Sequence, residues 1–108
     1  MAAGRFVDVW VNCPDRETAE KIAETLVTEK LAACANIFAP ISSIYRWRGA
    51  IERADEVPLL LKTRAGLFES LSVRVNELHP YEVPSIVATE LAIVEDAYAQ
   101  WLAEETDR

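Results

Sequence analysis

This 108-residue chain has one histidine, three glycines and no serine in the Gly-x-Ser-x-Gly pattern. Each of these shortages excludes a kind of site. The one histidine, His79, cannot by itself supply the two or three imidazoles of the usual catalytic zinc sites. The three glycines are isolated, so no glycine-rich loop is present to hold a phosphate group. No serine stands in the Gly-x-Ser-x-Gly context of a hydrolase nucleophile. We therefore expect that the protein is not an enzyme.

Long apolar runs and an excess of basic charge are also missing. Hydrophobic residues make up 51% of the chain, enough to fill the core of a single domain over residues 1–108. No run approaches the roughly 20 apolar residues that cross a bilayer, and the N-terminal residues do not resemble a secretory signal. The net charge of −7 disfavours nucleic-acid binding. We expect a cytoplasmic protein with neither a membrane nor a nucleic acid as partner.

Only two cysteines are present, and they are not in Cys-x-x-Cys spacing. Without an export signal, a disulfide between Cys13 and Cys34 is not expected. Cys34 lies among small apolar residues and is predicted to be a buried packing thiol. Cys13 ends a predicted strand just before Pro14, where solvent could reach it. A structural role is favoured for Cys13, and a soft-metal ligand is the alternative.

The hydrophobic periodicity predicts the order of the secondary structure. Alternation over residues 6–13 predicts a strand, and apolar residues at helical spacing after Asp15 predict a helix that Asp15 caps. The same patterns predict strands at 33–38, 41–47, 57–63 and 86–93, and helices at 65–78 and 95–104. This order indicates an α+β fold, a ferredoxin-like βαββαβ sandwich with an antiparallel sheet and an extra C-terminal helix.

A long, protruding β-hairpin is predicted around Gly49. Arg48, Gly49 and Ala50 form a tight-turn signal between residues 41–47 and a strand that begins at Ile51. With arms of about ten residues or more, the hairpin would extend past the neighbouring strands. Exposed strand edges are a liability unless another chain pairs with them. The hairpin therefore predicts a homo-oligomer.

Three polar or aromatic features near this hairpin are candidate sites. Tyr45 and Trp47 share one face of their predicted strand, where they form either a partner surface, which is favoured, or a ligand platform. Lys62 alternates out of step with the apolar residues beside it, so it is either solvent-facing or the cation of a pocket. The carboxylates within residues 52–56 either belong to a solvated loop or supply oxygen ligands to a hard metal.

The segment His79-Pro80-Tyr81-Glu82-Val83-Pro84 is the most informative in the chain. Two prolines make it stiff and prevent the preceding helix from continuing. An imidazole, a phenol and a carboxylate are thus presented together on a rigid connection, which is typical of a site. The alternative is a simple helix stop followed by the start of a strand.

Four short segments, at residues 27–37, 42–49, 60–63 and 79–84, resemble in sequence and in order the segments of the CutA divalent-cation tolerance family. The resemblance covers nearly the whole chain. It implies a ferredoxin-like subunit in a homotrimer, with extended hairpins that pair between subunits. It also implies a role in tolerance to copper and other divalent metals, and an architecture similar to the PII signalling trimers.

The first function that the resemblance implies is metal binding without an obligatory cofactor. His79, taken as an exposed imidazole, would be the principal Cu²⁺ ligand, with Glu82 or Cys13 assisting. The copper site described in the family uses a strand cysteine and two adjacent histidines. At the corresponding positions this sequence has Val11 in place of the cysteine and Leu78 in place of the first histidine.

The second function that the resemblance implies is small-molecule binding in a cleft between subunits, as in the PII proteins. Tyr45, Trp47, Lys62, His79 and Tyr81 would line this cleft. The aromatic rings would stack against the ligand, and Lys62 would bind an anionic group.

Overall fold

The computed structural model describes residues 5–108. Its elements are β1 (Phe6–Cys13), α1 (Arg16–Thr28), β2 (Cys34–Ile37), β3 (Ile41–Trp47), β4 (Ala50–Arg64), a 3₁₀ turn η1 (Ala65–Leu67), α2 (Phe68–Leu78), β5 (Ile86–Glu90) and α3 (Asp96–Glu105). The predicted α+β order is confirmed. The predicted helix at 65–78 begins as the 3₁₀ turn, and the last strand ends at Glu90, before the predicted boundary.

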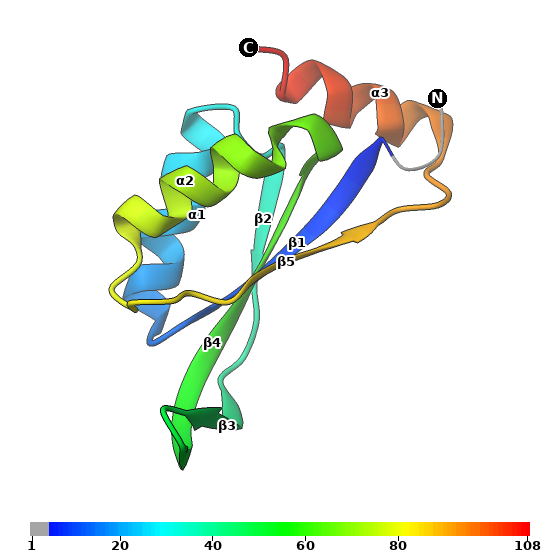
Figure 1. The fold of residues 1–108 in the computed structure, drawn as a ribbon. Helices are drawn as coiled ribbons and strands as arrows, with labels where there is room; N and C mark the ends of the chain where they lie inside the picture. The colour runs from blue at the N-terminus through cyan, green and yellow to red at the C-terminus, as the bar shows by residue number, and fades with distance from the viewer. Residues whose placement is uncertain (1–4) are drawn as a thin grey trace.

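The sheet has the strand order β2-β4-β1-β5, with antiparallel neighbours. Helices α1 and α2 lie side by side on one face of this sheet, while α3 lies at the end of the molecule that holds the C-terminus (Figure 1). Part of the opposite face is covered by α3, since Ala99 and Leu102 pack there with Phe6 of β1 and Ala33. The rest of that face is left open by the described chain.

The main core lies between the sheet and the helices α1 and α2. Because side chains alternate along a strand, Leu59 and Leu61 of the central strand β4 point to the same face, where both are fully buried. Ile22 of α1 and Leu71 of α2 are equally buried in the same cluster. The start of α1 is fixed as predicted, since Asp15 Oδ1 accepts a hydrogen bond of 2.8 Å from the Thr18 N–H.

The hairpin protrudes beyond the sheet, and it differs from the prediction in two ways (Figure 1). Strand β4 runs without interruption through residues 50–64, so the carboxylates of 52–56 lie on a strand and not in a loop. Strand β3 has seven residues and pairs with residues 50–56, so this arm is shorter than the expected ten. The turn is as predicted, because Arg48 and Gly49 take positive φ angles of 50° and 84°.

Within residues 5–108, none of the helices is sufficiently long and apolar to span a membrane.

Candidate functional site

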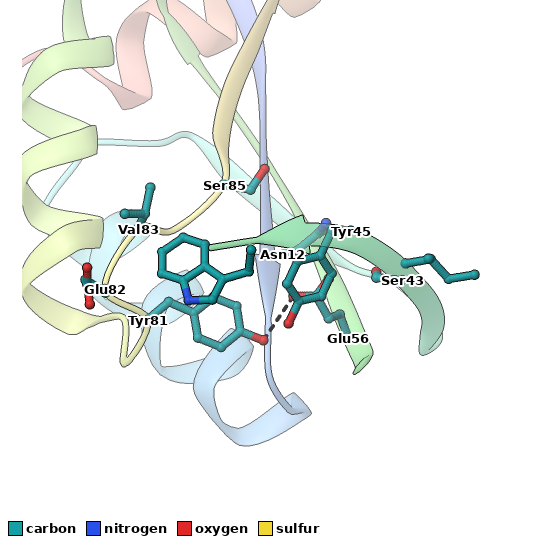
Figure 2. Close-up of a pocket in the computed structure, with 10 residues that line it drawn as sticks. Asn12, Ser43, Tyr45, Glu56, Tyr81, Glu82, Val83 and Ser85 are labelled. Atoms are coloured by element: carbon teal, nitrogen blue, oxygen red, sulfur yellow. Dashed lines mark hydrogen bonds between the residues drawn. The ribbon is translucent and has the colours of Figure 1, made fainter. Parts of the chain in front are cut away.

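A groove with a volume of about 660 Å³ lies between the hairpin and the segment that follows α2. Figure 2 shows it from close by, with side chains contributed by β1, β3, β4 and residues 81–85. The residues that line it are Asn12, Ser43, Ile44, Tyr45, Trp47, Glu56, Tyr81, Glu82, Val83 and Ser85. The volume falls in the range of small-molecule sites, about 300–1,000 Å³.

The register of the hairpin places the aromatic and acidic groups on the same side. Tyr45 and Trp47 are two residues apart in β3 and therefore share a face, as predicted. Glu56 of β4 is the cross-strand partner of Ile41, which belongs to the same alternating set. Tyr81 approaches from the other wall. In Figure 2 the rings of Tyr45 and Tyr81 and the carboxylate of Glu56 gather in one part of the groove.

Glu56 is a buried carboxylate, with only 7% of its surface exposed. The Tyr81 hydroxyl donates a hydrogen bond of 3.0 Å to Glu56 Oε2. Burial, followed by the hydrogen bond to Glu56 and the negative charge of that residue, raises the pKa of Tyr81 to about 12. The phenol therefore stays protonated at neutral pH and acts as a donor to Glu56.

His79 lies behind the groove wall and is buried, so the expectation of an exposed imidazole is wrong. Its Nδ1 accepts a hydrogen bond of 3.2 Å from the Tyr81 N–H. Its Nε2 lies 2.8 Å from the Asn12 carbonyl oxygen. Because Nδ1 accepts a hydrogen bond, the proton of the neutral ring is on Nε2, which therefore donates to this carbonyl. Both ring nitrogens are thus engaged within residues 5–108, and neither is free for a metal ion.

An ion pair connects the tip of the hairpin with the opposite wall. Arg48 Nη2 lies 2.9 Å from Glu82 Oε1 and 2.7 Å from Oε2. The same guanidinium is 5.1 Å from the centre of the Trp47 ring. Both partners of the ion pair are solvent-exposed, so it contributes little to stability. Its consequence is geometric, because it joins the two walls at one end of the groove.

Three of the five residues expected in the cleft line this groove: Tyr45, Trp47 and Tyr81. The other two do not. His79 supports Tyr81 from behind, and Lys62 donates to Asp8 Oδ1 over 3.0 Å on the sheet face opposite to α1 and α2.

Sequence reasoning missed Glu56 as a residue of the groove. It could have been found from strand alternation, had the predicted strand that begins at Ile51 been continued through the charged residues 52–56 opposite 41–47.

The residues expected to bind Cu²⁺ do not form a site within the described chain. Cys13 is fully buried, contrary to the expectation that solvent reaches it. Burial, followed by the charges of Asp15 and Glu56, raises the pKa of its thiol to about 12, so the thiolate that binds soft metals is disfavoured. Across residues 5–108, no three His, Cys, Asp or Glu side chains are grouped so that they could hold a metal ion. Residues 5–108 of a single chain therefore do not fit a bound Cu²⁺ ion.

The sequence matches the CutA1 divalent ion tolerance protein family over residues 7–105. The chain belongs to this family. It is 45% identical to the divalent-cation tolerance protein CutA of Pyrococcus horikoshii over 103 residues, which are 95% of this chain and 100% of that protein.

Solved CutA structures share the fold. The Thermus thermophilus structure has a TM-score of 0.92 at 44% identity, covering 94% of this chain and 99% of that one. A CutA from Archaeoglobus fulgidus, described as a periplasmic divalent cation tolerance protein, has a TM-score of 0.91 at 35% identity, with coverage of 94% and 99%. The predicted family and fold are confirmed.

The Tyr81–Glu56 hydrogen bond predicts a pH dependence. Because the pKa of Tyr81 is raised in the folded state from 10.0 to about 12, the folded protein holds this proton more tightly than the unfolded chain does. Its contribution to the free energy of unfolding is present below pH 10 and is lost as the pH rises from 10 to 12. Glu56→Gln removes the charge and should lower the pKa of Tyr81, measured by the absorbance of tyrosinate.

Tyr81→Phe serves as the control for this titration, because burial also raises the pKa of Tyr98. The difference between the wild-type and Tyr81→Phe curves isolates Tyr81. A transition of this difference curve at the ordinary tyrosine pKa would contradict the assignment.

Proposed function

We propose that the chain acts in divalent-cation tolerance as a homotrimer that binds a small molecule in the groove between the hairpin and the 79–85 segment, a role similar to that of the PII proteins. The observation that carries this proposal is the groove itself, whose walls hold three aromatic rings and a buried carboxylate. A small-molecule role also agrees with the lack of a metal-binding group within residues 5–108.

The exposed surfaces of the described chain support an oligomer, and the number of three copies is what the resemblance to the CutA family implies. Strand β3 pairs with β4 on one side, and no other strand of the described chain pairs with it. Ile44 and Ile51 of the hairpin are each 60% exposed. On the open face of the sheet, the rings of Trp10 and Phe38 lie 5.2 Å apart and both remain exposed. Free strand edges beside exposed apolar side chains are typical of surfaces that another chain covers.

Light scattering tests the oligomer. We expect a mass three times the 12.1 kDa of one chain at micromolar concentration. Ile51→Asp, which places a charge on the exposed hairpin, should reduce this mass because the charge would be buried against the next copy. Val73→Asp is the matched control, since Val73 is equally exposed but lies on α2. A wild-type mass of one chain would disprove the trimer.

Tryptophan fluorescence tests the groove. Trp47 lines it, whereas Trp10 lies on β1 and Trp101 on α3. In the double variant Trp10→Phe/Trp101→Phe, Trp47 is therefore the only reporter. We expect a saturable change in its emission with at least one member of a panel of nucleotides, carboxylates and amines. Trp47→Phe, which keeps the other two tryptophans, should show no such change. Failure of the whole panel would count against the small-molecule role.

Direct binding of a divalent metal such as Cu²⁺ is the second candidate, since the family and its relatives are named for tolerance to divalent cations. Within an oligomer, copies of His79, Glu82 and Cys13 from neighbouring subunits would have to be brought together. A calorimetric Cu²⁺ titration of the metal-free protein, run beside His79→Ala, tests this. Saturable binding that disappears in the variant would support a metal site at the 79–84 segment. Because both nitrogens of His79 are engaged, we expect instead no difference between the two proteins.

We also propose the cytoplasm as the compartment. Cys13 and Cys34 are free thiols in the structure, a state typical of reducing compartments. The Archaeoglobus relative is described as periplasmic, so cell fractionation decides between the two.

A further inference from the structure

The carboxylate of Glu56 has an unusual environment for a buried charge. The side chain is 93% buried, as its exposed fraction of 7% shows, and its hydrogen-bond partner is the neutral Tyr81 hydroxyl. None of the ion pairs formed among residues 5–108 includes Glu56. Buried carboxylates are normally paired with a cation, because an uncompensated charge away from water costs several kcal/mol. Glu56 therefore lacks a counter-ion within the described subunit.

Among the ten residues that line the groove, the one other charged side chain is already paired. Glu82 is paired with Arg48 at 2.7 Å, so its negative charge is matched. No lysine, arginine or histidine is among the ten residues that line the groove. The lining thus carries one unmatched negative charge, at Glu56. An anionic ligand would be repelled there, which argues against the anion-binding role first expected for this cleft.

The walls beside Glu56 favour a cation that is partly organic. The rings of Tyr45, Trp47 and Tyr81 line the same groove, and the face of an aromatic ring attracts a positive charge. Asn12 and Ser43 add oxygen atoms that can accept hydrogen bonds from a hydroxyl or N–H group of the ligand. Together with Glu56, these residues present one carboxylate, three rings and a few neutral acceptors.

A metal ion fits this lining poorly. Calcium takes six to eight oxygen ligands, and magnesium needs a near-ideal octahedron of them. Soft metals prefer thiolate or imidazole, and neither Cys13 nor His79 lines the groove. A volume of about 660 Å³ with three aromatic rings among its walls suits a molecule of several non-hydrogen atoms better than a bare ion.

We propose that the groove binds a small organic ammonium ion, with Glu56 as its counter-ion and Tyr45, Trp47 and Tyr81 as its aromatic walls. This inference rests on the proposed function, which places the ligand in the groove, and it adds the chemical class of that ligand. It is compatible with pairing of hairpins between subunits, because strand pairing uses the backbone edge of β3 and ligand binding uses side chains on one face.

Choline and its neutral carbon isostere, in which a tert-butyl group replaces the trimethylammonium group, test the proposal. The two probes have nearly the same shape and differ in charge. Each is titrated into the oligomer of the Trp10→Phe/Trp101→Phe variant, with Trp47 emission as the readout. We expect saturable binding of choline and an affinity for the isostere that is weaker by about tenfold or more, the size of effect typical of a desolvated cation–π contact with a counter-ion.

Glu56→Gln, made in the same background, tests the counter-ion. It keeps the size of the side chain and an oxygen that can accept from Tyr81, and it removes the charge. We expect it to weaken choline binding by about tenfold or more while leaving the isostere unchanged. Glu90→Gln is the matched control, since Glu90 is an exposed carboxylate at the end of β5, outside the groove. It should change neither affinity.

Each contrary outcome has a distinct meaning. Equal affinities for choline and the isostere would overturn the ammonium inference but leave the small-molecule role intact. The ammonium inference would also be overturned if neither probe binds, or if Mg²⁺ or Cu²⁺ displaces choline from the same site. In either case the wider ligand panel tests the proposed function separately. If Glu56→Gln lowers the oligomer mass and choline does not bind, a basic side chain of a second copy is the counter-ion, and the inference is wrong. If Glu56→Gln does not fold, the comparison of choline with its neutral isostere in the protein that keeps Glu56 still tests the proposal.

Discussion

The groove depends on the hydrogen bonds that His79 makes with both ring nitrogens. Nε2 reaches the Asn12 carbonyl near the end of β1, and Nδ1 accepts from the Tyr81 N–H two residues further along the chain. The imidazole is thus a bridge between the sheet and the 79–85 segment, two parts of the chain that are 67 residues apart at this contact. The rings of His79 and Tyr81 lie 4.6 Å apart, so the bridge also sets the position of the phenol. A residue with the chemistry of a metal ligand here holds one wall of a binding groove in place.

Strand β4 connects the groove to the hydrophobic core. Its residues 57–61 are buried in the sheet, while the preceding residues form the hairpin arm. Glu56 lies where these two parts meet, next to Val57, and its charge contributes to the raised pKa of both Cys13 and Tyr81. Because the strand is continuous, the position of the carboxylate is fixed by core packing and not by the hairpin turn.

Much of the fold could be predicted from the sequence, because its signals are local. The alternation in residues 6–13, the cap at Asp15 and the turn at Arg48–Gly49 each depend on neighbouring residues, and all three are present in the structure. The charged run at 52–56 was harder to assign, since in isolation it has the composition of a loop. Only its pairing with β3 makes it a strand.

The site was less predictable, because its key properties arise from contacts distant in sequence. His79 is hydrogen-bonded to Asn12, Glu56 to Tyr81, and Lys62 to Asp8 on the neighbouring strand, and each of these partners is distant in sequence. The face shared by Tyr45 and Trp47 was predictable from strand alternation alone. The sequence therefore indicates which residues are candidates for a site. Which of them line the groove and which support it from behind follows only from their tertiary contacts.

Most of the groove lining lies outside the hydrophobic core, and this separation affects how the family can diversify. Ser43, Ile44 and Val83 line the groove but belong to neither core cluster. Substitutions at such surface positions usually change the free energy of unfolding by no more than about 0.5 kcal/mol. The shape and polarity of the groove can accordingly change from one relative to another with little effect on folding. Two proteins with this scaffold and high overall identity can thus differ mainly at the groove, and a selection experiment confined to these positions would vary the groove surface on an unchanged framework.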